Sequence, residues 1–122
     1  MARIHNVYIP DANFAWKGLT CLYGIGKSTA FDILEALKID PYVRVKDLAT
    51  EQIILISNYI TEHYKVEGDL KREVLSNIKA LIEMRSYRGM RHAVGLTVRG
   101  QRTKNNNGAK RRTRAGLARR KK

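Results

Sequence analysis

The apolar residues between positions 28 and 46 recur with helical spacing. One stripe follows i, i+3, i+4 and i+7 positions: Ala30, Ile33, Leu34 and Leu37. This spacing places the four side chains on one face of a helix. We expect Ser28 or Thr29 to cap that helix, because their hydroxyls can accept a hydrogen bond from a free backbone N–H, and Asp40-Pro41 to end the helical region. A short alternation at Val43 and Val45 does not suffice to predict a sheet.

Two further helices are predicted between positions 47 and 85. The first has Asp47 or Thr50 as its expected cap and continues through Tyr64, with three isoleucines along one face: Ile53, Ile56 and Ile60. The second begins at Glu67-Gly68-Asp69 and runs to about Arg85. Its apolar stripe contains Leu70, Val74, Ile78, Leu81 and Ile82. Each pattern is that of an amphipathic helix.

The first 26 residues have a looser pattern. Residues 1–11 read as an extended arm, and a short helix is expected from Asn13 to Tyr23. Gly24-Ile25-Gly26 then interrupts the helix. Two glycines permit positive φ angles and a close backbone approach, and Ile25 between them can enter the core. The sequence therefore predicts a glycine turn between two helices.

The pattern changes after Arg85. Apolar residues become sparse, and glycines recur at positions 89, 95, 100, 108 and 116. We expect a short helical turn around Tyr87–His92 and then a tail without a core of its own. The predicted fold class is all-α, with a helical globular domain at 1–85 and an extended basic tail at 86–122.

Charge divides the chain at the same place. Residues 1–84 contain 10 Lys/Arg and 11 Asp/Glu, whereas residues 85–122 contain 14 Lys/Arg and no acidic residue, within a total net charge of +13. A segment without acids repels itself and stays extended until it meets a polyanion. Nucleic acid, an anionic membrane and an acidic protein are the polyanions available.

A membrane is the weakest of these partners. The tail has few large apolar residues to insert, and the longest uniformly apolar run is Ile53-Ile54-Leu55-Ile56, against about 20 residues needed to span a bilayer. The first eleven residues do not form the apolar stretch of a signal peptide, and the one cysteine excludes an internal disulfide framework. We therefore expect a location in the cytoplasm or an organelle's interior.

Residues 85–104 have the composition of a nucleic-acid-binding segment. Arginine guanidinium groups bind phosphate oxygens in pairs, and Tyr87 and His92 offer flat faces to an unstacked base or a ribose. Gln101 and Thr103 can bond sugars or base edges, while the interleaved glycines allow close backbone approach. A solvated charged linker does not need this mixture, so we expect contact with nucleic acid. Composition alone does not separate RNA from DNA.

Gly26-Lys27-Ser28-Thr29 resembles the end of a nucleotide-binding P-loop, but the motif needs glycine where Cys21 stands. An NTPase is therefore disfavoured. Lys27 and the free N–H groups of the following helix could instead bind a phosphate, with a tight turn that binds no ligand as the equal alternative.

Other side chains suited to catalysis or metal binding have simpler explanations. Glu67, Asp69 and Glu73 suit a helix start, through capping and the macrodipole. The three histidines lie at positions 5, 63 and 92 with no second ligand at metal-binding spacing, so we expect no metal site. We expect His63 on a helix surface and Cys21 in the core.

Five motifs, in order along the chain, then identify a family. They are Ala2-Arg3-Ile4 with Ile9-Pro10, Leu19-Thr20 with Tyr23-Gly24-Ile25-Gly26, Glu67 through Glu73, Tyr87 through His92, and Val98 through Lys104. With them the chain resembles the bacterial-type small-subunit ribosomal protein thirteen family. Three places depart from the family pattern. Ala93-Val94 stand where basic residues are usual, Thr97 stands where a proline is usual, and Asn105-Asn106-Asn107 stand where a Thr-Asn-Ala type stretch is usual.

The resemblance implies a helix–two-turn–helix element in the N-terminal domain, a long helix and an extended tail, in a structural protein with no enzymatic activity or cofactor. The implied partners are small-subunit rRNA, small-subunit ribosomal protein nineteen, large-subunit ribosomal protein five and large-subunit rRNA at intersubunit bridges, and P-site tRNA. The candidate rRNA contacts are Arg3, Lys27, Tyr87, Arg88, Gly89, Arg91, His92, Arg99, Gly100, Gln101, Arg102, Thr103 and Lys104. The tRNA-proximal residues would be Arg119, Arg120, Lys121 and Lys122. A DNA-binding architectural protein is the alternative.

Overall fold

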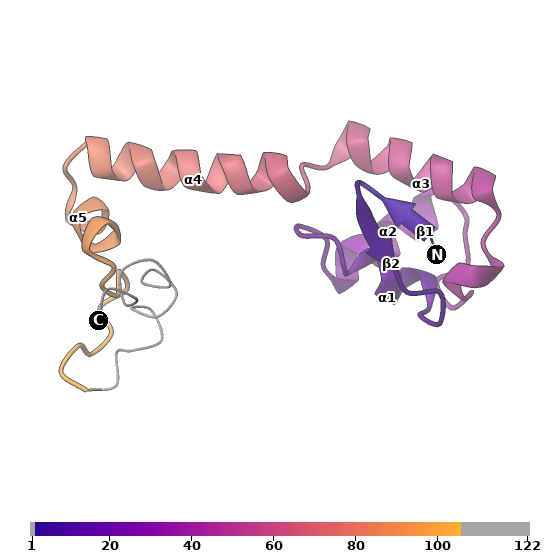
Figure 1. Ribbon diagram of the computed structural model, residues 1–122, viewed down its shortest axis with the longest axis horizontal. Helices are drawn as coiled ribbons and strands as arrows, with labels where there is room; N and C mark the ends of the chain where they lie inside the picture. The colour runs from indigo at the N-terminus through magenta and orange to yellow at the C-terminus, as the bar shows by residue number, and fades with distance from the viewer. Residues whose placement is uncertain (1, 106–122) are drawn as a thin grey trace. The chain divides into compact units, whose positions relative to one another are not determined.

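The computed structural model describes residues 2–105, which are mostly helical (Figure 1). The all-α prediction is confirmed, with one small sheet added. The elements in order are β1 (Ala2–Ile4), β2 (Val7–Ile9), α1 (Ala15–Leu19), α2 (Lys27–Ala36), a 3-10 turn (Val45–Asp47), α3 (Thr50–His63), α4 (Glu67–Glu83) and α5 (Tyr87–Val94). No helix in the described part of the chain is long and apolar enough to cross a membrane.

The N-terminal arm is a β-hairpin and not a single extended strand. β1 and β2 pair antiparallel, and Ile4 lies opposite Val7 at the closed end. The two loop residues both have positive φ, 48° at His5 and 66° at Asn6. Two-residue loops with positive φ at both positions match the right-handed twist of the strands. The hairpin places Ile4 and Ile9 in the core.

The predicted helix at 13–23 is shorter than expected. α1 ends at Leu19, and two successive turns follow, closed by Leu22 N–H to Leu19 O at 3.1 Å and Ile25 N–H to Leu22 O at 3.2 Å. These turns bury Leu22 and Ile25 against the same core. A helix, two turns and a second helix are therefore present in this order.

Only the first glycine of the Gly24-Ile25-Gly26 turn has a positive φ. Gly24 has φ of +106°, and a Cβ there would lie 2.7 Å from Leu70 Cδ2. Gly26 has φ of −95° and is the N-terminal cap of α2. Both backbone conformation and packing therefore require glycine at position 24, whereas neither requires it at position 26.

The residues predicted to cap α2 and α3 are not their caps. Ser28 and Thr29 lie inside α2, and no side chain caps it. Ala49 precedes α3, and its N–H donates to Gln52 Oε1 at 3.1 Å, so neither Asp47 nor Thr50 is the cap. The α4 prediction is confirmed, since that helix begins at Glu67 and ends at Glu83.

Contacts divide the chain into two compact units between Arg72 and Glu73, inside α4. The first unit has an aliphatic core in which α2 packs on α1 and α3, and α3 packs on β1. Its largest fully buried side chains are Ile9, Leu22, Ile33, Leu34, Ile56 and Ile60. None of the residues of α4 is fully buried among the described residues, so the apolar stripe along this helix is only partly covered there, with Leu70, Ile78 and Leu81 half-buried. The division at 85/86 expected from charge stays a prediction.

Candidate nucleic-acid interface

The basic segment begins with helix α5, whose two ends are both capped. Ser86 Oγ accepts the N–H of Gly89 at 3.1 Å and donates to Leu81 O at 3.0 Å. At the other end, Leu96 N–H donates to Arg91 O at 2.9 Å and Gly95 N–H to His92 O at 3.2 Å. Gly95 is left-handed, with φ of 72°, so this end is a Schellman motif. The expected helical turn at Tyr87–His92 is therefore a complete helix that extends to Val94.

Gly89 allows α5 to lie directly against the end of α4. A Cβ at this position would meet the carbonyl of Leu81, lying 2.5 Å from its carbon and 2.8 Å from Ile82 Cα. Both of these are backbone atoms, which cannot move aside as a flexible side-chain end can. Gly89 is buried, so the structure gives it a packing role. Its expected contact with RNA stays a prediction.

Arg91 connects α5 to the loop that follows. Its Nε donates to Thr97 O at 2.9 Å, a partly buried hydrogen bond, and its guanidinium carbon lies 5.9 Å from the centre of the Tyr87 ring. Arg91 therefore has an internal role in addition to its positive charge. The signal in the sequence is weak, because the acceptor is a backbone carbonyl, which any residue at position 97 would supply.

The loop after α5 has local hydrogen bonds and an exposed surface. Thr97 Oγ1 donates to Gln101 O at 3.3 Å, and Arg99 N–H donates to Gln101 Oε1 at 3.2 Å. Gly100 has φ of +73° with open space around it. Residues 99–105 are all exposed. The loop thus presents Arg99, Arg102 and Lys104 to solvent, with Gln101 partly engaged in holding its backbone.

Together, α5 and the loop form a cationic surface without acids. Residues 85–104 contain six Lys/Arg and no Asp/Glu, and Arg88 and Tyr87 are exposed, Tyr87 at 69%. His92 is half-buried in the last turn of α5. Ser86 was not among the expected site residues, although a serine before a helix is an ordinary capping signal. Such a surface can bind phosphates through Arg88, Arg99, Arg102 and Lys104.

The other two expected contacts belong to the first unit. Arg3 is exposed on β1, with its guanidinium carbon 5.2 Å from the centre of the Tyr8 ring. Lys27 is the first residue of α2, and its Nζ lies 5.6 Å from the centre of the Trp16 ring. Turns and not a strand precede Lys27, which argues further against a P-loop. Each of the two cations lies over an aromatic face.

Glu67 fixes the turn at Tyr23 to the start of α4. Its Oε1 accepts the N–H of Tyr23 at 2.8 Å, and its own N–H donates to Tyr23 O at 2.9 Å. The Tyr23 hydrogen bond lowers the pKa of the Glu67 carboxyl, with a smaller contribution from Lys71. The Lys71 Nζ lies 3.5 Å from Glu67 Oε2. Glu67 is the first residue of α4, as expected, but its carboxylate accepts the N–H of Tyr23, 44 positions away, and not one from α4. Its expected capping role therefore stays a prediction, and the link to Tyr23 was not foreseen.

Two expectations about single residues have opposite outcomes. Cys21 is exposed, so its predicted core position is wrong, because the helix in which it was placed ends at Leu19. His63 is exposed at the end of α3 and stacks on Tyr59 with ring centres 4.2 Å apart, as expected for a helix surface. Among residues 2–105 no three His, Cys, Asp or Glu side chains are grouped to hold a metal ion.

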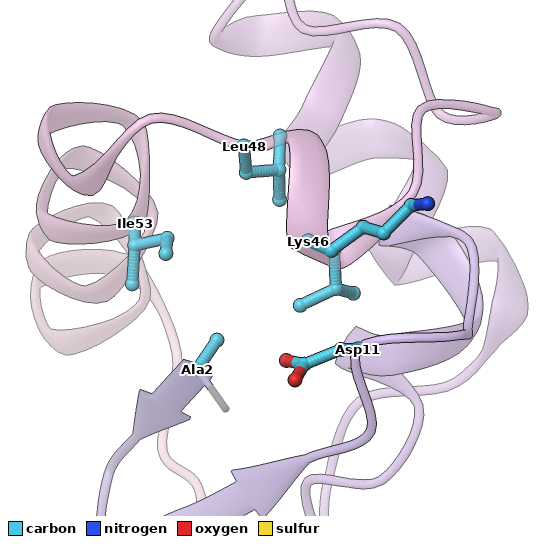
Figure 2. A pocket seen from close by; sticks show the side chains of 6 residues that line it. Ala2, Asp11, Lys46, Leu48 and Ile53 are labelled. Atoms are coloured by element: carbon cyan, nitrogen blue, oxygen red, sulfur yellow. The ribbon is translucent and has the colours of Figure 1, made fainter.

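A pocket of about 280 Å³ lies elsewhere on the first unit (Figure 2). Ala2, Val45, Leu48 and Ile53 give it apolar walls, and Asp11 and Lys46 add polar groups. None of the expected RNA contacts lines it, so it forms no part of the candidate interface. The expected tRNA-proximal residues Arg119–Lys122 lie outside the described residues.

The sequence of this chain is similar to those of one family of known proteins. The family model "Ribosomal protein S13/S18" matches residues 3–111. The chain is 53% identical over 106 residues to the small ribosomal subunit protein uS13 of Petrotoga mobilis, covering 87% of this chain and 88% of the relative. It is 52% identical over 106 residues to the uS13 protein of Thermotoga maritima, with 87% and 85% covered. The uS13 protein of Endomicrobium trichonymphae is 51% identical, with 87% and 82% covered.

Proposed function

The chain belongs to the ribosomal protein S13/S18 family, a family of structural and non-enzymatic proteins of the small ribosomal subunit, and on this premise we propose that residues 85–104 bind rRNA in the head of that subunit. The observation that carries the proposal is the surface made by α5 and its following loop. It has five Lys/Arg side chains, no acid and a backbone fixed by internal hydrogen bonds.

The proposed binding is electrostatic and geometric. Arg88, Arg99, Arg102 and Lys104 neutralise phosphates, and Tyr87 offers a face for a base or ribose. Ser86, Gly89 and Arg91 act earlier, because they fix α5 and the loop before RNA arrives. A pre-ordered cationic surface loses less conformational entropy on binding than a flexible one does.

The remaining partners follow from family membership and belong to the same proposal. We assign to the first unit the contacts with large-subunit ribosomal protein five and large-subunit rRNA at intersubunit bridges. Small-subunit ribosomal protein nineteen is the proposed neighbour in the head. Arg119–Lys122 are proposed to approach P-site tRNA, and Arg3 and Lys27 to add rRNA contacts from the first unit.

Chemical footprinting of small-subunit rRNA tests the proposal. The purified full chain is added at moderate salt with excess competitor duplex DNA, and nucleotide protection is compared with and without protein. Discrete protection in the head domain that survives the competitor is the expected result. Diffuse protection that the DNA removes would instead indicate a general polycation, and the DNA-binding alternative would then lead.

A further inference from the structure

The chain's aromatic side chains are concentrated outside its core. The sequence contains one tryptophan and two phenylalanines, and all three lie in one cluster with Tyr42. Trp16 stacks on Phe31 with ring centres 5.6 Å apart, and Tyr42 lies 6.2 Å from both Phe31 and Phe14. The fully buried large residues are, by contrast, all Ile or Leu. Trp16 packs against that core, but packing of the core does not explain the two exposed rings of the cluster, Tyr42 and Phe14.

Backbone pairing fixes the exposed part of this cluster. Ala15 N–H donates to Val43 O at 2.8 Å, and Val45 N–H donates to Asn13 O at 2.9 Å, so residues 13–15 run beside residues 43–45. Alternation then points Val45 inward, whereas Tyr42 and Arg44 face solvent. Tyr42 is 64% exposed and Phe14 39% exposed. Two large rings are thus held at the surface by paired backbone segments.

Cations cover two of the rings. The Arg44 guanidinium carbon lies 5.8 Å from the centre of the Phe14 ring, and Lys27 Nζ lies 5.6 Å from the Trp16 centre. Arg44 Nη1 also donates to Ala12 O at 3.3 Å, which fixes its direction. The carboxylate of Asp40 also contacts the cluster, where its Oδ1 accepts the Tyr42 N–H at 2.9 Å. Both ends of the cluster therefore combine a flat apolar face with a positive charge.

We propose that Tyr42, Phe14, Arg44 and Lys27 form a second RNA-binding surface, which binds an unpaired nucleotide by stacking its base on Tyr42 while Arg44 holds an adjacent phosphate. Aromatic faces beside cations are the means by which proteins hold single-stranded RNA. A protein partner could use the same rings, but the two cations over the ring faces favour a polyanion. The inference rests on the proposed function, because it requires a chain that works on RNA.

Photo-crosslinking tests this surface directly. The full chain is mixed with a single-stranded uridine oligoribonucleotide carrying one 4-thiouridine, irradiated, and digested for peptide mapping. We expect crosslinks to peptides containing Phe14 or Tyr42 in addition to those from residues 85–104. A blunt RNA duplex should give few crosslinks at Tyr42, because its bases are not free to stack.

Matched variants separate stacking and charge from general effects. Tyr42→Ala and Arg44→Gln should each lower the crosslink yield at the cluster by at least about fivefold, as expected for the loss of one stacked base or its phosphate contact, and leave the yield at 85–104 unchanged. Tyr8→Ala and Lys46→Gln remove an exposed tyrosine and an exposed cation outside the cluster, and should change neither yield. Equal helical circular dichroism verifies that each variant is folded.

Two results would overturn the inference. Crosslinks restricted to residues beyond 84 would mean that the cluster does not meet RNA, while the proposed function would stand. Absence of RNA binding by the whole chain in a mobility-shift assay would remove the proposed function and the inference together.

Discussion

Gly89 lies so close to the carbonyl group of Leu81 that no side chain fits between them, since a Cβ would lie 2.5 Å from the Leu81 carbonyl carbon. This approach sets the position of α5 on the end of α4. The cationic surface begins on α5, so its geometry depends on a residue that bears no charge. Packing and the proposed RNA binding are therefore coupled at this position.

Gly89→Ala should detach α5 from α4. Overpacking against fixed atoms costs about 1–3 kcal/mol, so the protected amides of Met90 and Leu96 should exchange with solvent deuterium about 5–150 times faster. Gly68→Ala is the control, because nothing lies within 4 Å of a Cβ there. Unchanged exchange in Gly89→Ala would contradict the close contact.

Ser86→Ala should weaken α5 at its first turn. The change removes the acceptor of the Gly89 N–H and the donor to Leu81 O, and loss of such a cap costs about 1 kcal/mol. The Gly89 amide should then exchange about fivefold faster. Ser86→Thr keeps the hydroxyl and should retain most of the protection. If Ala and Thr behave alike, the cap does not stabilise the helix.

Gly24→Ala should destabilise the first unit, whereas Gly26→Ser should not. Alanine at position 24 meets both the positive φ and Leu70 Cδ2, and we expect the free energy of unfolding to fall by about 1–3 kcal/mol. Serine suits the extended N-cap conformation at position 26, and it should raise the free energy of unfolding by roughly a few tenths of a kcal/mol. Urea denaturation measures both, and equal losses would show that the two glycines are equivalent.

Glu67→Gln should change how stability responds to acid. The Tyr23 N–H lowers the pKa of the folded Glu67 carboxyl, so the charge stabilises the fold above the unfolded pKa of about 4.3. This contribution is lost as pH falls through the lower folded pKa. The melting temperature of the wild type should therefore exceed that of the variant at pH 6, with a gap that narrows below about pH 4.3.

Glu83→Gln is the matched control for that titration. Glu83 is exposed and pairs with Lys79 at 3.9 Å, whereas Glu67 accepts a backbone N–H. A gap between Glu67→Gln and wild type that stays constant from pH 6 to pH 3, or a Glu83→Gln variant with the same narrowing gap, would contradict the account of Glu67.

Periodicity predicted the helices better than their ends. The stripe from Leu70 to Ile82 located α4 within two residues, because many positions contribute to it. The start of α2 depends on a single cap, and Gly26 takes that position through its backbone. The His5-Asn6 turn was missed although histidine and asparagine are enriched at positive φ. An alternating pattern of three residues per strand is too short to predict a hairpin.

The candidate interface was predictable in composition but not in its internal contacts. Charge and motif order identified residues 85–104. The Arg91 to Thr97 hydrogen bond ends on a backbone carbonyl, and the Gly89 contact involves the backbone of Leu81, so neither has a side-chain signal in the sequence. The aromatic cluster joins Phe14 to Tyr42 through backbone pairing between distant segments, which helical periodicity does not detect.

The most direct test of the central claim is the salt dependence of binding to a head-domain fragment of small-subunit rRNA. Arg88, Arg99 and Arg102 are replaced together by Gln, and the control replaces three exposed cations of the first unit, Lys17, Lys38 and Lys46. Each lost phosphate contact should reduce the slope of log affinity against log salt by about 0.7–0.9. The account predicts a slope shallower by about 2–3 for the arginine variant and an unchanged slope for the control. Equal slopes for both variants would contradict it.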